Sequence, residues 1–290
     1  MSNRRVFSLV LVATIVAFAA PSTGQVDTTA VIAAWNLSGF NPIEGSRIPR
    51  LAKAIADIDA AVVALVEVNP NEVVDKLVIE LGKLGACYQF KILDQTARQN
   101  LAILYKTGVS VTNPQFIAGS DDNNSQLRKA LTADVRVGQF DFKIIALHLK
   151  SGRTSANRET RSRQATVIAN FIATATAGPE KDVLVVGDYN MIPDQDAVNF
   201  TAMNPSGFLR FVSSEDLSGQ ISHISDATTG TGSLLDGYAI SKDYTQEYIE
   251  GSLQIVPLPR ILKITLTEYG RNYSDHFPLA ARFRITVDDD

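Results

Sequence analysis

The chain is poor in the side chains that bind soft metals or form disulfides, because its 290 residues include one cysteine and three histidines. The single cysteine, Cys87, excludes an intramolecular disulfide, and its neighbours Ala86 and Tyr88 predict a buried thiol. No closely spaced set of histidines or cysteines is present, which disfavours a zinc site. An excess of positive charge is also missing, since the net charge is −4, which argues against a protein that coats nucleic acid.

Long apolar runs are missing except near the N-terminus, where Arg4 and Arg5 precede an uncharged stretch over 6–20. This order of basic, apolar and small residues predicts a secretory signal peptide over 1–24, with cleavage between Ala19 and Gln25. An uncleaved anchor is the alternative, because the apolar run approaches the length that spans a bilayer. We therefore expect a secreted or periplasmic monomer without stable membrane association after cleavage.

Residues 25–290 are predicted to form a single domain, since layered α/β folds often reach about 250 residues. The apolar patterns predict mixed sheets with parallel βα units and antiparallel neighbours. Residues 191–217 are expected to be rich in loops, and 218–233, rich in Ser, Thr and Gly, are predicted to form a long surface loop. The predicted strands cover 30–37, 61–68, 88–93, 101–105, 109–112, 130–137, 140–149, 182–186, 234–241 and 279–287, and the predicted helices cover 46–58, 72–84 and 155–176.

Polar side chains suited to acid–base chemistry lie at the ends of apolar strands, the usual place for chemistry on a sheet. An ordinary imidazole titrates near pH ~6.5, so a histidine there can exchange a proton under mild conditions. Each histidine alone could be structural, but their joint occurrence with carboxylates favours an active site. The residues concerned are His148, Asp188, Asn190, Asp275 and His276.

Two other strands end on oxygen-bearing side chains. Glu67 follows six apolar residues, where a carboxylate is costly unless it is paired or bound to a cation. Asn36 ends the first predicted strand, and its amide can bind a metal through oxygen or orient a carboxylate through nitrogen. Together they predict a site for Mg2+ or Mn2+, with Ca2+ as a further candidate; a helix-capping Glu and a turn Asn are the alternative. Asp236, near the start of the strand over 234–241, has no obvious helix to cap.

Six short motifs around these residues, taken in their order along the chain, resemble those of the endonuclease/exonuclease/phosphatase superfamily, which has a deoxyribonuclease I-like fold. The resemblance covers essentially 25–290, and six motifs in order are more specific than any one of them. It implies an α/β (α+β) fold, a four-layer α/β sandwich in which two packed mixed β-sheets are flanked by helices. The motifs are W-N at 35–36, E-V at 67–68, H-L-K-S-G at 148–152, G-D-Y-N at 187–190, L-D-G-Y at 235–238 and S-D-H-F-P at 274–278.

The resemblance also implies a metal site and a group that activates water. Asn36 and Glu67 would belong to the metal site, and Asp275 would join it or pair with His276. His276 would be the general base, or the imidazole oriented by Asp275, that activates the attacking water.

The same resemblance implies roles for four further residues. His148 would contact the phosphate or protonate the leaving oxygen. Asp188 and Asn190 would position the nucleophile and the transition-state oxygens. Asp236 would orient the second imidazole.

Subfamily motifs narrow the resemblance. The chain has L-D-G at 235–237 where inositol polyphosphate phosphatases have C-D-R, and it lacks the Y-P-N segment of apurinic-site endonucleases at 148–151. A histidine at the end of this strand, such as His148, instead resembles the deoxyribonuclease, sphingomyelinase and secreted-nuclease branches of the superfamily. Arg153, Arg158 and Arg161 could bind phosphates that flank the scissile one, with an ordinary charged helix face as the alternative.

These observations predict a secreted metal-dependent phosphodiesterase, a nuclease that hydrolyses DNA or RNA by attack of water at phosphorus. One alternative is a phospholipid (sphingomyelinase-like) or small-molecule phosphoesterase, for which Phe208 and Phe211 are weak candidates for a membrane-insertion loop. The other is a catalytically silent binding module of the same fold.

Overall fold

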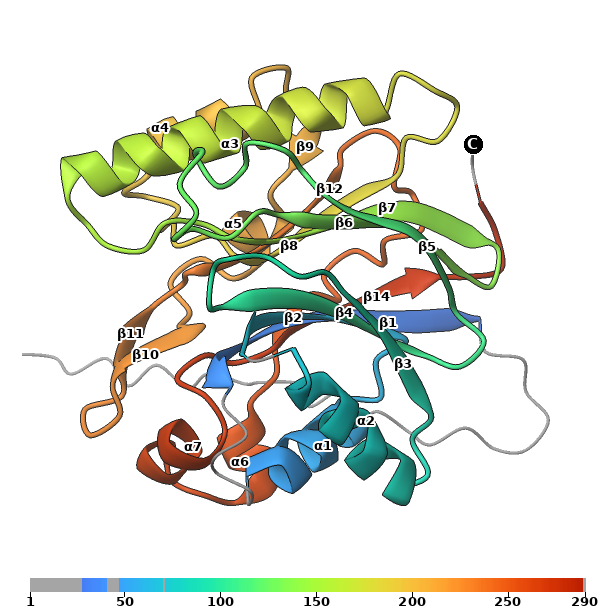
Figure 1. The fold of residues 1–290 in the computed structure, drawn as a ribbon, viewed down its shortest axis with the longest axis vertical. Helices are drawn as coiled ribbons and strands as arrows, with labels where there is room; N and C mark the ends of the chain where they lie inside the picture. The colour runs from blue at the N-terminus through green and yellow to red at the C-terminus, as the bar shows by residue number, and fades with distance from the viewer. Residues whose placement is uncertain (1–27, 41–46, 70, 289–290) are drawn as a thin grey trace, which may run out of the picture.

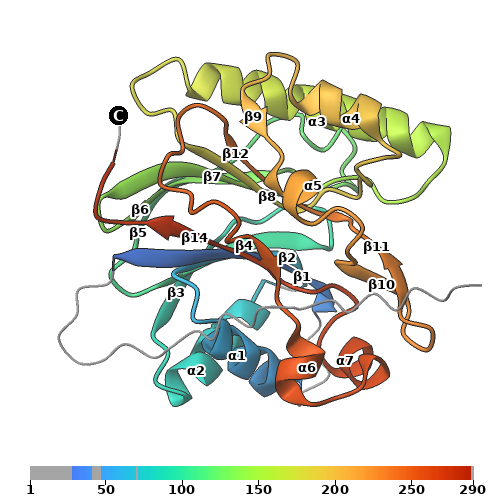
Figure 2. The ribbon, with the colours of Figure 1, turned by 180° about the vertical axis from the view of Figure 1, so that it is seen from behind.

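Two β-sheets pack face to face, and helices cover the outer faces of both, as the two views in Figure 1 and Figure 2 show. The computed structural model describes residues 28–40, 47–69 and 71–288, so the predicted signal peptide at 1–24 lies outside the described residues. The predicted four-layer sandwich is confirmed. Within the described ranges, no helix is both long enough and apolar enough to cross a membrane.

The first sheet has six strands, and only β1 and β2 run parallel, because α1 (Arg47–Ile58) connects them. Successive residues of β1 point to opposite faces, so Ile32 packs between the sheets while Ala33 and Trp35 pack against the helices. The strand order is β13 (Gln254–Ile255), β14 (Leu279–Arg284), β1 (Thr29–Phe40), β2 (Val62–Val68), β4 (Asn100–Lys106) and β3 (Tyr88–Ile92).

The second sheet repeats this plan. Its one parallel pair is β7 and β8, which α3 (Ser155–Ala175) connects, and its other neighbours are antiparallel. The strand order is β5 (Ser110–Phe116), β6 (Leu131–Val137), β7 (Phe140–His148), β8 (Val183–Asp188), β12 (Asp236–Ser241) and β9 (Leu209–Arg210).

Three apolar clusters hold the layers together. The central cluster lies between the sheets and includes the stacked rings of Phe140 and Phe283, whose centroids are 5.4 Å apart. A second cluster packs the first sheet against its helices, and a third packs the second sheet against α3. The first sheet is covered by α1, α2 (Val73–Lys83), α6 (Leu258–Leu262) and α7 (Leu266–Asn272), and the second by α3 and α4 (Ala197–Met203).

The structure corrects several local predictions. The segment expected to be rich in loops contains α4, β9 and α5 (Val212–Asp216), which are too short to give a periodic apolar signal. The predicted surface loop over 218–233 contains a hairpin, β10 (His223–Asp226) and β11 (Thr231–Ser233). Cys87 is exposed rather than buried, because it lies in the connection between α2 and β3, directly before β3.

The two parallel pairs bring the predicted polar residues to one end of the sandwich. In parallel strands the carboxyl ends share one edge of the sheet, and both pairs end at the same mouth. His148 and Asp188 pair in register across β7 and β8, and Asp188 also pairs with Asp236 across β8 and β12. Three candidate residues from three strands therefore lie side by side by backbone register alone.

Candidate active site

A cleft of about 350 Å³ opens at this mouth. A larger hollow of about 450 Å³ lies over β5, β6 and β7, but no histidine lines it. The smaller cleft is therefore the candidate active site. It is lined by Ser38, Glu67, Gln99, His148, Ser151, Gly152, Arg153, Asp188, Asn190, His223, Leu235, Asp275 and His276.

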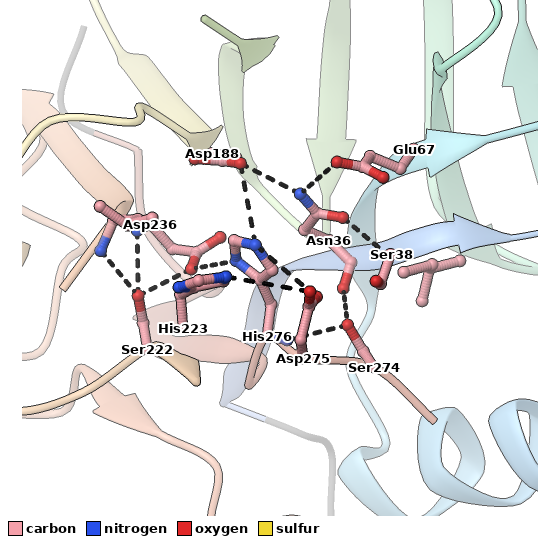
Figure 3. A network of polar contacts seen from close by, with 12 residues as sticks. Asn36, Ser38, Glu67, Asp188, Ser222, His223, Asp236, Ser274, Asp275 and His276 are labelled. Carbon is pink, nitrogen blue, oxygen red and sulfur yellow. Dashed lines mark hydrogen bonds and ion pairs between the residues drawn. The ribbon is translucent and has the colours of Figure 1, made fainter. Parts of the chain in front are cut away.

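His276 is fixed by a chain of hydrogen bonds, shown in Figure 3. Its Nδ1 lies 2.8 Å from Oδ2 of Asp236, and the Ser222 hydroxyl donates to the same oxygen at 2.7 Å. Burial alone would lower the pKa of His276, but the charge and hydrogen bond of Asp236, helped by Asp188 and Asp275, raise that pKa to about 10. The imidazole therefore carries a proton when nothing else occupies the cleft.

Asp236, and not Asp275, orients His276. The Oδ1 atom of Asp275 is 3.9 Å from Nε2 of His276, too far for a hydrogen bond. The expectation that Asp275 orients His276 is thus wrong, and the carboxylate of Asp236 acts on His276 rather than on His148. Asp275 lines the same cleft as Glu67, but its carboxylate groups with the rings of His223 and His276, whereas Glu67 groups with His148 and Asp188.

Asn36 ties two carboxylates together. Its Nδ2 donates to Oδ2 of Asp188 at 3.1 Å and to Oε1 of Glu67 at 3.2 Å, while its Oδ1 accepts the amide of Ser38 at 2.9 Å. The amide nitrogen, rather than the oxygen, faces the carboxylates, so Asn36 has the orienting role that the sequence left open. Glu67 itself has a left-handed backbone with φ 63°, which a glutamate adopts only when its surroundings hold it there.

The pair of Glu67 and Asp188 fits a hard divalent cation. Burial first of all, and then the charges of Asp236 and Glu67, raise the pKa of Asp188 to about 7, although His276 acts in the opposite direction. A buried carboxylate with this much unfavourable negative charge around it is relieved by a cation. Carboxylate oxygens are the ligands that Mg2+ prefers, so the residues present fit the predicted metal.

His148 lies between these carboxylates and is almost fully buried. Its Nε2 is 3.5 Å from Oδ2 of Asp188 and 3.6 Å from Oε1 of Glu67. Burial, followed by the positive charges of Arg128 and His276, lowers the pKa of His148 well below its ordinary value. A neutral imidazole can donate a hydrogen bond to a phosphate oxygen but has no extra proton for a leaving group. Of the two predicted roles, the phosphate contact fits this geometry.

Asn190 follows β8 with a left-handed φ of 52°. Its backbone amide donates to Oδ1 of Asp188 at 2.8 Å, and its side chain donates to the carbonyl of Leu149 at 3.2 Å. The residue directly before Asp188 has to be a glycine, because a Cβ at Gly187 would lie 2.3 Å from the carbonyl oxygen of Leu147. These contacts aim the carboxylate of Asp188 into the cleft.

The three predicted phosphate-binding arginines converge on one buried carboxylate, that of Asp196. Arg153 is 2.7 Å, Arg158 3.0 Å and Arg161 3.2 Å from its oxygens. The prediction for Arg161 is wrong, because its side chain is 0% exposed and also donates to backbone carbonyls of Lys150 and Gly152. Only Arg153 of the three lines the cleft.

Sequence reasoning missed four residues of the site. Arg128 is buried, donates to the carbonyl of Leu149 at 3.3 Å and places its charge near Asp188 and Glu67. Gln99 donates to Oε2 of Glu67 at 2.7 Å. Ser222 and His223 lie in the segment predicted to be a surface loop. The one available signal was that His223 is the third of only three histidines.

Residues 33–244 match the model of the endonuclease/exonuclease/phosphatase family, which is more than half of the chain. The chain belongs to this family. The family match ends before the segment of Asp275 and His276, which the fold nevertheless brings to the same cleft. No curated protein matches the chain in sequence.

Several solved structures share this fold. Humanized D. rerio TDP2 with 14 mutations has a TM-score of 0.67 and 19% identity, over 89% of this chain and 100% of that one. D. rerio TDP2 complexed with a single-strand DNA product has 0.65 and 18%, over 89% and 100%. The human Nocturnin catalytic domain with a bound sulfate anion has 0.63 and 19%, over 88% and 93%.

Proposed function

We propose that the chain is a metal-dependent phosphodiesterase, and that its substrate is DNA or RNA. The observation that carries this proposal is that the His276–Asp236 pair, His148 and the carboxylates of Asp188 and Glu67 all face one cleft. Burying so many polar groups at one place is costly unless they act together. This cost argues against a silent binding module.

In the proposed reaction, a water oxygen forms a bond to phosphorus while the bond to the ester oxygen breaks. The ester oxygen leaves with the bonding electron pair as an anion and takes its proton from solvent water. Part of the negative charge that raises the pKa of His276 is offset when a cation lies beside Asp188, which frees Nε2 to accept a proton from the water. Asp236 stays hydrogen-bonded to Nδ1 and stabilises the imidazolium. His148 and Asn190 donate hydrogen bonds to phosphate oxygens.

Glu67 and Asp188 would hold Mg2+ or Mn2+, which supplies positive charge to the phosphate when bound. Asn36 keeps both carboxylates pointed at each other through its two hydrogen bonds. Arg128 adds a fixed positive charge beneath them.

Nucleic acid is favoured over a phospholipid for two reasons. Arg153 stands at the cleft, where it can contact a neighbouring phosphate of a polymer. Phe211, one of the two weak membrane-insertion candidates, packs edge-on against Phe200 and Tyr189, and Phe208 packs against Tyr244. The fold relationship to TDP2, of which one structure contains a single-strand DNA product, agrees with this choice. We further propose export through the segment at 1–24.

The test is hydrolysis of bis(p-nitrophenyl) phosphate and of end-labelled single-stranded DNA and RNA, each with Mg2+ and after exhaustive chelation. We expect cleavage that chelation abolishes and that Mg2+ or Mn2+ restores. A sphingomyelin assay run in parallel addresses the phospholipid alternative. Tight binding of DNA without any turnover in Mg2+ would instead identify a binding module.

A further inference from the structure

His223 and His276 lie side by side at the cleft, although 52 residues separate them in the sequence, and Asp275 reaches both rings. The ring centroids are 4.6 Å apart. Oδ2 of Asp275 is 3.8 Å from Nε2 of His223, and its Oδ1 is 3.9 Å from Nε2 of His276. Figure 3 shows the carboxylate and both rings turned toward one another.

Backbone contacts hold this trio in place. His223 and His276 form an antiparallel bridge. On either side of it, the amide of Ile224 donates to the carbonyl of Asp275 at 2.7 Å, and the amide of Phe277 donates to the backbone carbonyl of Ser222 at 2.7 Å. Asp236 fixes the Nδ1 edge of His276, which leaves Nε2 facing the cleft. A histidine that binds a metal through one ring nitrogen usually donates its other ring N–H to a carboxylate, as Nδ1 of His276 can to Asp236.

The trio also has a polar atom that its protein surroundings do not satisfy. Oδ1 of Asp275 is buried and has no hydrogen-bond partner among the residues that the structure describes, although 43% of the side chain is exposed toward the cleft side. A buried carboxylate oxygen is costly unless a hydrogen bond or a cation compensates it. The nearest polar atom of His276, Nε2, is itself a metal ligand when it carries no proton.

We propose that His223, Asp275 and His276 form a second cation site, selective for Zn2+ or a similar borderline metal, next to the oxygen site of Glu67 and Asp188. Two imidazoles and one carboxylate are a zinc donor set, whereas Mg2+ prefers oxygen ligands. Zinc bonds of about 2.1 Å in tetrahedral geometry place ligand atoms about 3.4 Å apart. One ligand atom from each of the three residues already lies within 4.8 Å of the others, so small side-chain rotations bring the set to zinc-binding distances. The fourth position faces the cleft.

This site has a consequence for the reaction, and that consequence rests on the proposed function. Zinc on Nε2 of His276 occupies the atom that accepts the proton from water. Zinc therefore inhibits the phosphodiesterase that Mg2+ activates. The binding itself requires no activity.

The binding test is calorimetric titration of Zn2+ into the chelator-stripped chain in excess Mg2+. We expect one tight zinc ion, and an affinity lower by about 100-fold or more in His223→Gln and in Asp275→Asn, since loss of even an orienting partner costs about 10- to 100-fold. The matched control is His148→Gln, which removes a histidine from the neighbouring site and should keep the zinc affinity. Thermal melting shows whether each variant is folded.

A readout on the unmutated chain does not depend on any variant folding. The chain has three histidines, so long-range nitrogen–proton spectra resolve each ring. We expect Zn2+ to shift Nε2 of His223 and His276 and to leave His148 unchanged. Zinc shifts confined to His148, or an affinity lost in His148→Gln but kept in His223→Gln, would overturn the proposal. So would the lack of any zinc binding tighter than that of Mg2+.

The inhibition arm separates the two proposals. With an active enzyme, the zinc concentration for half-inhibition should rise in His223→Gln by the same factor as the dissociation constant. If the chain binds zinc at the trio but hydrolyses no phosphodiester, the zinc site stands and the proposed function fails. If it hydrolyses phosphodiesters but His223 has no effect on zinc binding, the zinc site fails alone.

Discussion

His276 is bound by Asp236 on one edge and faces Asp188 with the other, at 3.9 Å. His148 meets the same Asp188 oxygen from another strand, at 3.5 Å. The two imidazoles therefore share one carboxylate, and their surroundings move their pKa values in opposite directions. Such a split fits different roles for the two rings, proton transfer by His276 and hydrogen bonding by His148.

The first prediction concerns these two histidines. His276→Ala and His148→Ala should each lower turnover by about 10²- to 10⁴-fold, because each removes a group that contacts water or phosphate. If both serve one displacement at phosphorus, the double variant should be much less than additively worse than either single one. Turnover per folded molecule is the measurement. A near-normal rate in either single variant would remove that histidine from the mechanism.

The second prediction concerns Ser222 as a positioning residue. Its hydroxyl donates to Asp236 and accepts the amides of Leu235 and Asp236, both at 3.0 Å. Ser222→Ala should cost about 1–3 kcal/mol of stability, because buried polar groups lose their partner. It should also lower turnover per folded molecule, since Asp236 no longer holds His276 in one orientation.

A matched control exists for Ser222. Ser213 is buried and its hydroxyl accepts the amide of Tyr238 at 2.9 Å on the same strand β12. Ser213→Ala should lose similar stability and keep kcat, and Ser222→Thr should recover part of the lost kcat. Equal kcat losses in both serine variants would reduce Ser222 to a structural residue.

At the scale of elements, the start of α3 is fastened to the segment before α4 through Asp196. Its carboxylate is fully buried and accepts the amide of Ile192 at 2.9 Å besides meeting three arginines. This arrangement fixes the loop that carries Arg153 to the cleft. A run of arginines that could have bound substrate thus serves mainly to join two helices.

The third prediction follows from this cluster. Asp196→Asn should destabilise the protein by about 3–5 kcal/mol at neutral pH, because Arg161 is left buried without a counter-charge. Asp194→Asn, an exposed change on the same segment, should be neutral. Urea unfolding of the three proteins gives the comparison. Equal stabilities would show that the cluster contributes nothing.

The pH dependence of this difference has a fixed sign. Burial would raise the pKa of Asp196, but the Ile192 amide and the arginines outweigh it and lower that pKa. The contribution to stability is therefore complete above the unfolded value of about 3.9 and is lost as the pH falls through the lower folded value. The gap between the original chain and Asp196→Asn should narrow on acidification, and a gap that widens would contradict this account.

At the scale of the whole molecule, the site joins the two halves of the sandwich. Asn36 and Glu67 come from the first sheet, and His148, Asp188 and Asp236 come from the second. The hydrogen bond from Asn36 to Asp188 crosses from one sheet to the other. A metal ion held by Glu67 and Asp188 would therefore bind both halves.

The fourth prediction is that Mg2+ stabilises the fold as well as the reaction. At 100 times its dissociation constant, a ligand that binds only the folded state adds about 2.7 kcal/mol, which thermal melting detects as a higher Tm. Glu67→Gln should lose this shift, and Glu159→Gln, an exposed change on α3, should keep it. A Tm that does not respond to Mg2+ would contradict a metal shared by the two sheets.

The fifth prediction concerns export. The segment at 1–24 should be cleaved between Ala19 and Gln25, because small residues follow its apolar run. Mass spectrometry of the extracellular or periplasmic protein gives the N-terminus. An exported protein that retains Met1 would indicate an uncleaved anchor instead.

The sequence by itself determined the layers and most of the cleft. Long apolar strands and amphipathic helices, such as α1 with Ile48, Leu51 and Ile55 on one face, have a periodicity that survives without tertiary context. A polar residue at the end of an apolar strand is equally visible, which is how His148, Asp188 and His276 were found. These signals are local, so they need no knowledge of partners.

Tertiary structure alone decided which side chains pair. Whether Asp236 or Asp275 holds His276, and whether an arginine faces a phosphate or Asp196, depends on distances between segments far apart in the chain. The hairpin that carries His223 forms from short, apolar-poor strands, and only its bridge to His276 brings a histidine next to another. Spacing along the chain therefore disfavoured a donor set of two imidazoles and one carboxylate, which only the packing of the folded chain brings together.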